Sequence, residues 1–147
     1  METEARIEDI VEMLGLGGGK KHGYSRQWLA RQIAKGLPIT AVDRIAETLF
    51  AGQEGVLDVI VSDAATMRRR RENRPLSPEH SARVERMARV WIMAHDVFGD
   101  DDKARRFLFT PHMLLDGEAP IEVAALNDVG ADAVGSLLGR LKYGSVA

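Results

Sequence analysis

Apolar residues recur with helical spacing along almost the whole chain, which leaves little room for β-structure. Ile7, Ile10, Val11 and Leu14 follow the spacing i, i+3, i+4, i+7, which places their side chains on one face of a helix. Further stripes of this kind occupy residues 42–49, 56–61, 84–98, 121–126 and 134–141. No stretch alternates apolar and polar residues over several positions, as a strand with one buried face would. The pattern therefore predicts an all-α fold.

Residues that favour helix ends divide this pattern into separate helices. The hydroxyl groups of Ser25 and Ser77 can accept a hydrogen bond from a free amide at the start of a helix, and Pro78 suits the first helical turn. Gly36 and Gly99 stand where helices commonly end with a left-handed residue. These signals predict one helix between Ser25 and Gly36 and a longer helix from Pro78 to Gly99.

A linker around Pro75 marks the expected domain boundary, since proline restricts the residue before it to extended backbone. We therefore expect three parts: an N-terminal helical extension with a glycine-rich loop over residues 1–36, a helix-turn-helix domain over residues 37–75, and a small helical domain over residues 76–147. At 147 residues, of which 45% are hydrophobic and 29% are charged, the chain is long enough to bury a core of its own.

Composition narrows the location and class of the protein. The sequence has no apolar run of about eighteen residues and no basic, apolar leader at its acidic start, so we expect a cytoplasmic protein without a membrane segment. Its formal net charge of −2 argues against a protein that coats nucleic acid over its whole surface. The chain contains no cysteine, which rules out disulfides, thiolate zinc sites and cysteine nucleophiles.

A cluster of arginines is the strongest local concentration of charge. It lies on a predicted helix over residues 63–72, which follows the apolar stripe at 56–61 after a break of one or two residues. Two helices joined by a tight turn are the outline of a helix-turn-helix. Consecutive arginines point in all directions around a helix, so some of them face solvent and can neutralise phosphates. The predicted DNA-binding residues are Thr66, Arg68, Arg69, Arg70 and Arg71. The alternative for this segment is a solvated basic helix end.

The residues that could support catalysis or metal binding form no recognisable constellation. None of the four histidines, His22, His80, His95 and His112, has a second histidine at i+3 or i+4. The glycine-rich run over residues 15–21 lacks the spacing, the hydroxyl residue and the preceding strand of a phosphate-binding loop. No serine occupies the setting of a catalytic nucleophile. We therefore expect no enzymatic activity, no metal and no cofactor.

Short motifs follow one another in a specific order from Gly36 to the C-terminus. They are Gly36-Leu37-Pro38, Thr66-Met67-Arg68-Arg69-Arg70-Arg71, Leu76-Ser77-Pro78-Glu79, Ala88-Arg89-Val90, Val97-Phe98-Gly99-Asp100, Lys103-Ala104, Ala119-Pro120, Leu138-Gly139-Arg140-Leu141 and Tyr143-Gly144. In this order and with these separations, the chain resembles the antitoxins of the Xre/MbcA/ParS family, whose C-terminal toxin-binding domain pairs with RES-domain toxins.

The resemblance implies an Xre-like helix-turn-helix domain followed by a toxin-binding domain, in a protein that works as a homodimer. It also implies a partner toxin that consumes NAD or transfers ADP-ribose from it, and a C-terminal segment that blocks the toxin's NAD pocket. Carried over by position, this segment consists of Arg140, Tyr143, Gly144, Ser145, Val146 and Ala147. Operator DNA would be the second partner. The alternative is a stand-alone helix-turn-helix regulator whose C-terminal domain only dimerises.

Overall fold

The computed structural model describes residues 5–20, 23–51 and 64–144, and these ranges are mainly helical. The elements are α1 (Ile7–Leu14), the 3₁₀ turn η1 (Gly17–Gly19), α2 (Arg26–Lys35), α3 (Thr40–Phe50), α5 (Ala64–Arg71), α6 (Pro78–Phe98), α7 (Asp101–Phe109), the 3₁₀ turn η2 (Met113–Leu115), α8 (Pro120–Leu126) and α9 (Asp128–Tyr143). The described residues contain no β-strand, so the predicted all-α fold is confirmed. The apolar stripe at residues 56–61 lies outside the described residues. None of the described helices is long and apolar enough to cross a membrane.

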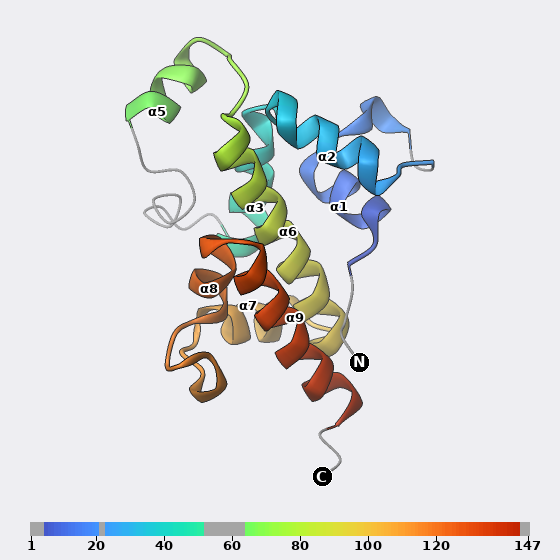
Figure 1. The fold of residues 1–147 in the computed structure, drawn as a ribbon, viewed down its shortest axis with the longest axis vertical. Helices are drawn as coiled ribbons and strands as arrows, with labels where there is room; N and C mark the ends of the chain where they lie inside the picture. The colour runs from blue at the N-terminus through green and yellow to red at the C-terminus, as the bar shows by residue number, and fades with distance from the viewer. Residues whose placement is uncertain (1–4, 21–22, 52–63, 145–147) are drawn as a thin grey trace.

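The long helix α6 runs through the middle of the molecule (Figure 1). It contacts α1, α2 and α3, which precede it in the chain, and α7, α8 and α9, which follow it. Val84, Met87, Ala88 and Trp91, four of its predicted core positions, are at most 6% exposed. The helices on both sides of α6 in the sequence therefore share one hydrophobic core. The domain boundary predicted near Pro75 lies just before α6 and stays a prediction.

The predicted capping residues begin and end the helices. Ser25 and Ser77 each accept a hydrogen bond from the backbone amide three residues later, at 3.0 and 3.1 Å. Asp100 starts α7 in the same way, through the backbone amide of Lys103. Gly99 ends α6 in the left-handed conformation, with φ of 69°. These local contacts explain why simple sequence signals locate the ends of α2 and α6.

A backbone junction around Leu37 ties the end of α2 to the start of α6. The amide of Leu37 donates to the buried Ser81 hydroxyl at 2.8 Å, and the amide of Leu76 donates to the Leu37 carbonyl at 2.9 Å. Gly36 precedes this junction with φ of 99°, and a Cβ atom there would lie 2.2 Å from the Leu76 carbonyl oxygen. Only glycine allows both this backbone conformation and this close approach.

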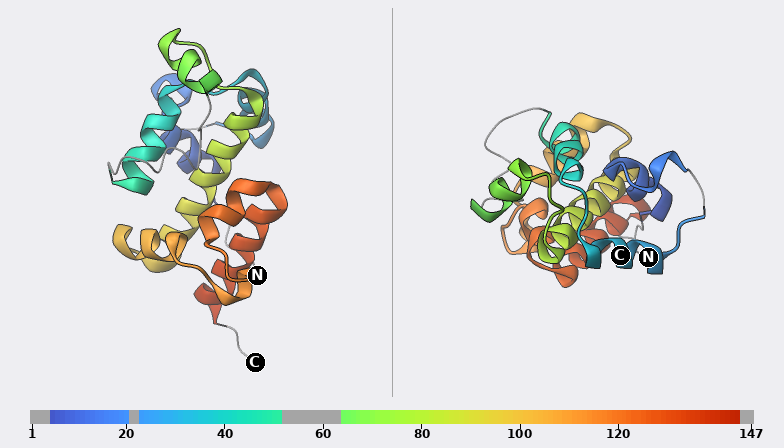
Figure 2. Two further views of the ribbon diagram at one scale, coloured as in Figure 1. Left: turned by 90° about the vertical axis from the view of Figure 1, so that its left-hand side faces the viewer. Right: turned by 90° about the horizontal axis from the view of Figure 1, so that it is seen from above.

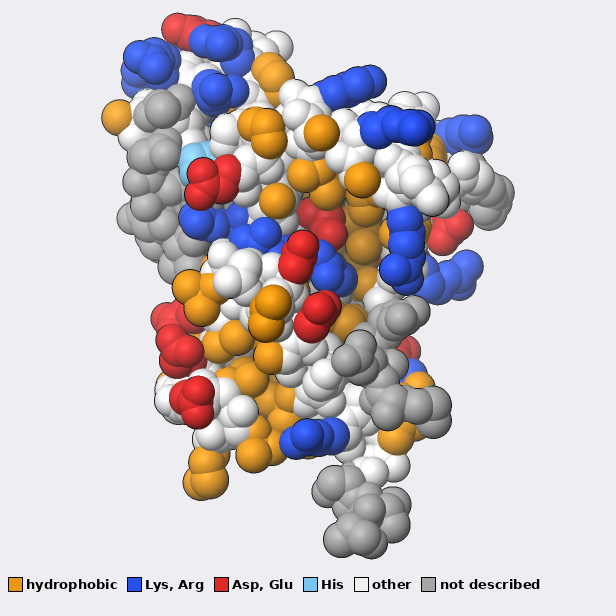
Figure 3. All heavy atoms as spheres, in the orientation of Figure 1, with side chains coloured by type: hydrophobic (Ala, Val, Ile, Leu, Met, Phe, Trp, Pro, Cys, Tyr) orange, Lys and Arg blue, Asp and Glu red, His pale blue; other side chains and the backbone are white. Residues whose placement is uncertain are grey.

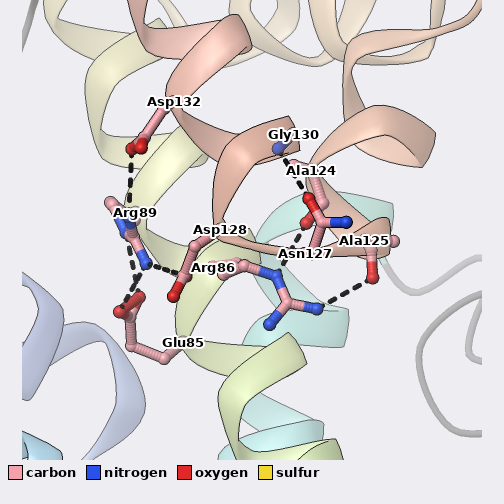
Figure 4. A network of polar contacts seen from close by, with 9 residues as sticks. All are labelled: Glu85, Arg86, Arg89, Ala124, Ala125, Asn127, Asp128, Gly130 and Asp132. Atoms are coloured by element: carbon pink, nitrogen blue, oxygen red, sulfur yellow. Dashed lines mark hydrogen bonds and ion pairs between the residues drawn. The ribbon is translucent and has the colours of Figure 1, made fainter.

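Arg86 of α6 anchors the turn between α8 and α9 (Figure 4). Its guanidinium donates from Nε to the Ala124 carbonyl at 2.9 Å and from Nη2 to the Ala125 carbonyl at 2.8 Å. These are carbonyl groups of the last turn of α8, which has no helical partner for them. Directly after this turn, the Asn127 side chain caps α9 by accepting from the amide of Gly130 at 2.9 Å.

Arg89, one turn further along α6, joins the same region to the first turns of α9 (Figure 4). It donates to both carboxylate oxygens of Glu85, at 2.9 and 3.1 Å, and to Asp128 at 3.2 Å. Its Nη1 atom also lies 3.8 Å from Asp132. Burial alone lowers the pKa of Arg89, but the hydrogen bonds to Glu85 and Asp128 outweigh it and raise the pKa overall. The direction of α9 is therefore set by charged contacts as well as by apolar packing.

The helix α5 and the end of α9 lie at opposite ends of the molecule (Figures 1 and 2). α5 lies beside the start of α6, whereas the last turns of α9 lie beside the end of α6, beyond α8. The two segments that the sequence marks as binding sites are thus separated by the length of α6.

Candidate functional site

The arginines of α5 form a basic surface at one end of the molecule (Figure 3). Arg69 donates to the Pro75 carbonyl at 2.9 Å, and Arg70 forms an ion pair with Asp43 of α3 at 2.9 Å. Arg68 and Arg71 are exposed and have no side-chain partner among the residues that the structure describes. The predicted basic residues therefore divide into two that hold α5 in place and two that project into solvent.

Thr66 differs from the other predicted DNA-binding residues because it is only 3% exposed. Its hydroxyl lies 3.1 Å from Nδ1 of His80 in the first turn of α6. Together with the contacts of Arg69 and Arg70, this contact turns one face of α5 toward the rest of the molecule. A direct contact between Thr66 and DNA stays a prediction.

The end of α9 presents the predicted toxin-binding residues that the structure describes. Arg140 and Tyr143 are exposed, the latter by 49%, and Gly144 ends the helix with φ of 73°. Ser145, Val146 and Ala147 lie outside the described residues. The last turn before the tail thus offers a cation and an aromatic ring to a partner.

An ion pair between Lys142 and Asp96 fastens the end of α9 to α6. The hydrogen bond to Asp96 raises the pKa of Lys142, since it favours the charged form of the ammonium group. Because the two side chains are 35% and 49% exposed, we assign the pair a positioning role rather than a large stabilising one.

Several exposed apolar side chains lie on η2, α8 and α9 and were not predicted as binding residues (Figure 3). Leu141 is 47% exposed although Val134, Leu137 and Leu138 on the same helix are buried. The other members lie on η2, α8 and the first turn of α9: Met113 (89%), Leu114 (61%), Leu126 (67%) and Val129 (77%). Such exposed apolar side chains are candidates for contact with another molecule.

The described residues contain no group of three His, Asp or Glu side chains that could hold a metal ion. His95 contacts the Asp101 carboxylate at 2.9 Å and the ring of the buried Trp91. His112 accepts from the amide of Leu114 at 3.1 Å through its Nδ1 atom. These contacts give both histidines structural partners.

Two family models match successive segments of the chain. Residues 29–89 match the antitoxin Xre-like helix-turn-helix domain, and residues 93–144 match the C-terminal toxin-binding domain of Xre/MbcA/ParS antitoxins. A relative named Antitoxin Xre, from Pseudomonas putida, is 28% identical over 128 residues, which cover 83% of this chain and 72% of the relative. The first matched segment contains α5, and the second contains α7, α8 and α9.

Proposed function

Because the chain belongs to the Xre/MbcA/ParS type of antitoxins, we propose that it inhibits a cytoplasmic RES-domain toxin by placing its C-terminal segment in the toxin's NAD pocket. The inhibitor is a homodimer, and it represses its own operon through the basic helix α5. Inhibition of this kind requires binding only, with no chemical step by the antitoxin.

The exposed end of α9 is the observation that supports the toxin-binding part of this proposal. Arg140, Leu141 and Tyr143 present a charge, an apolar side chain and a ring on the last turn of the helix. The Lys142–Asp96 ion pair holds this turn in a defined direction before any partner arrives. A preformed helix end loses less conformational entropy on binding than a disordered segment, which favours tight inhibition.

Removing the tail tests the proposal. The chain without Gly144–Ala147 and the full chain are each co-expressed with the toxin encoded by the neighbouring gene, and both complexes are purified by size exclusion. Because the truncation leaves all of α9 in place, we expect it to fold and to lose inhibition of NAD consumption. Full inhibition by the truncated chain would exclude the blocking segment. A full chain that elutes apart from the toxin would support a stand-alone regulator instead.

The exposed Arg68 and Arg71 support the DNA-binding part of the proposal. Guanidinium groups bind phosphate oxygens with paired hydrogen bonds, and a recognition helix uses such contacts to fix its position in the groove. α5 lies at one end of the molecule, and no other described helix extends beyond it there (Figure 2). This position leaves room for a duplex.

A further inference from the structure

One outward face of α7 combines cations with an aromatic ring. Lys103, Arg106, Phe107 and Thr110 follow the spacing i, i+3, i+4, i+7 and therefore lie in one row. On the inward face, Ala104 and Leu108 are fully buried in the core. The basic row is thus not needed for packing, apart from the partly buried ring of Phe107.

This row borders a surface hollow of about 410 Å³. Phe98 from the end of α6 and His112 from the segment after α7 complete its lining. The rings of Phe98 and Phe107 lie 5.3 Å apart, and the rings of Phe107 and His112 lie 6.3 Å apart. The hollow therefore has an aromatic floor large enough for an apolar side chain of another molecule.

The rim of the hollow carries uncompensated positive charge. The side chains of Lys103 and Arg106 are exposed and have no charged partner among the residues that the structure describes. The acidic side chains at the start of α7 contact other groups. Asp101 and Asp102 contact Arg105, at 3.9 and 3.1 Å, while Asp100 caps the helix through a backbone amide. This positive charge would attract an anionic partner.

The hollow lies at the same end of the molecule as the exposed end of α9. Lys142 pairs with Asp96, which precedes Phe98 by two residues on α6. All six lining residues also fall within the segment that matches the toxin-binding domain. A protein that receives the C-terminal segment in its pocket would bring the edge of that pocket toward α7.

We propose that this hollow docks an acidic segment of the toxin, with an apolar side chain on the aromatic floor and carboxylates beside Lys103 and Arg106. The contact adds a second attachment point outside the blocked pocket. This inference rests on the proposed function, because the partner is the toxin of the same complex.

A double charge reversal tests the inference with the toxin encoded by the neighbouring gene. The dissociation constant is measured for the full chain, for Lys103→Glu/Arg106→Glu, and for Arg31→Glu/Lys35→Glu, which makes the same change of charge on exposed positions of α2. We expect the α7 variant to bind roughly tenfold more weakly or worse, since like charges then meet across the contact. We expect the α2 variant to bind like the unmodified chain.

A second variant tests the hollow without changing charge. Thr110→Trp places a bulky ring at the exposed edge, which should fill the space and weaken toxin binding as well. If the unmodified chain binds the toxin and both α7 variants bind equally well, the inference is wrong while the proposed function stands. If the unmodified chain does not bind the toxin, the proposed function fails and the inference fails with it. Unchanged toxin binding together with loss of dimerisation in the α7 variants would assign the hollow to a second copy and overturn the inference.

Discussion

Arg86 Nε donates a hydrogen bond to the Ala124 carbonyl oxygen at 2.9 Å, which joins the centre of α6 to the end of α8. The arginine is 8% exposed, and burial lowers the pKa of its guanidinium from the ordinary value. A buried cation of this kind persists because helix-end carbonyls, which carry partial negative charge, replace water around it. Through this contact the direction of α9 depends on a side chain in the middle of α6.

Replacing Arg86 should therefore destabilise the whole C-terminal half. Arg86→Met leaves the Ala124 and Ala125 carbonyls without their donor, and we expect the free energy of unfolding to fall by about 2 to 4 kcal/mol. Urea denaturation followed by circular dichroism measures the change. Arg31→Met, at an exposed position of α2, is the matched control and should alter stability by less than about 0.5 kcal/mol. Equal midpoints for the two variants would show that Arg86 has no anchoring role.

Gly36 should tolerate no side chain. Gly36→Ala combines strain at φ of 99° with a Cβ placed 2.2 Å from the Leu76 carbonyl oxygen, so the junction before α6 must shift. We expect a loss of about 2 kcal/mol or more in stability. Gly18→Ala is the reference for an alanine in the left-handed helical region, because Gly18 has φ of 60° and ψ of 30° and nothing lies within 4 Å of the added atom. A thermal midpoint for Gly36→Ala no lower than that for Gly18→Ala would exclude the close approach as the cause.

Helix ends were predictable because their causes are local. Ser25 and Ser77 bond to amides three residues away, and Gly99 needs only a backbone conformation that glycine prefers. Such contacts involve one stretch of chain, so spacing and residue type contain the necessary information. The same holds for the buried stripe of α6, whose positions follow from helical period alone.

Contacts between distant segments could not be predicted in this way. Arg86 belongs to a polar face of α6 in the sequence, yet the α8–α9 turn covers that face and buries the arginine. Thr66 was expected on a DNA-facing helix, but its hydroxyl lies against His80 because α5 folds back on the start of α6. Leu141 continues the apolar spacing of α9 and is nevertheless exposed, since no other described element extends far enough to cover it.

Substitutions at Leu138 and Leu141 should have different effects, the first on the free energy of unfolding and the second on toxin binding. Leu138 is fully buried, so Leu138→Ala should cost about 2 to 5 kcal/mol of unfolding free energy. Leu141 is 47% exposed, so Leu141→Ala should leave stability within about 1 kcal/mol of the original while it weakens binding of the toxin. Thermal unfolding and calorimetric titration with the toxin measure the two effects. Undiminished toxin binding by Leu141→Ala would remove this residue from the proposed interface.

The exposed arginines of α5 should account for the salt dependence of operator binding. Arg68 and Arg71 each neutralise a phosphate in the proposed complex, so each change to alanine should reduce the slope of log affinity against log salt by about 1. Fluorescence anisotropy with operator DNA over a range of salt concentrations gives the slope. Arg31→Ala, on α2, should leave the slope unaltered. A slope that both α5 variants share with the unmodified chain would place the DNA contact elsewhere.

The separation of α5 from the end of α9 predicts that DNA and toxin bind at the same time (Figure 1). Neither ligand covers the surface proposed for the other, so toxin should add to an antitoxin–operator complex rather than displace the DNA. Coupling between two sites requires that each ligand favour a different state of the protein. α6 joins the two ends through a continuous core, and the network at Arg86 and Arg89 holds α9 in one direction, which argues for a single rigid state. A gel-shift assay with increasing toxin should show a slower complex that contains all three components. Release of free operator DNA would demonstrate that toxin binding changes the position of α5.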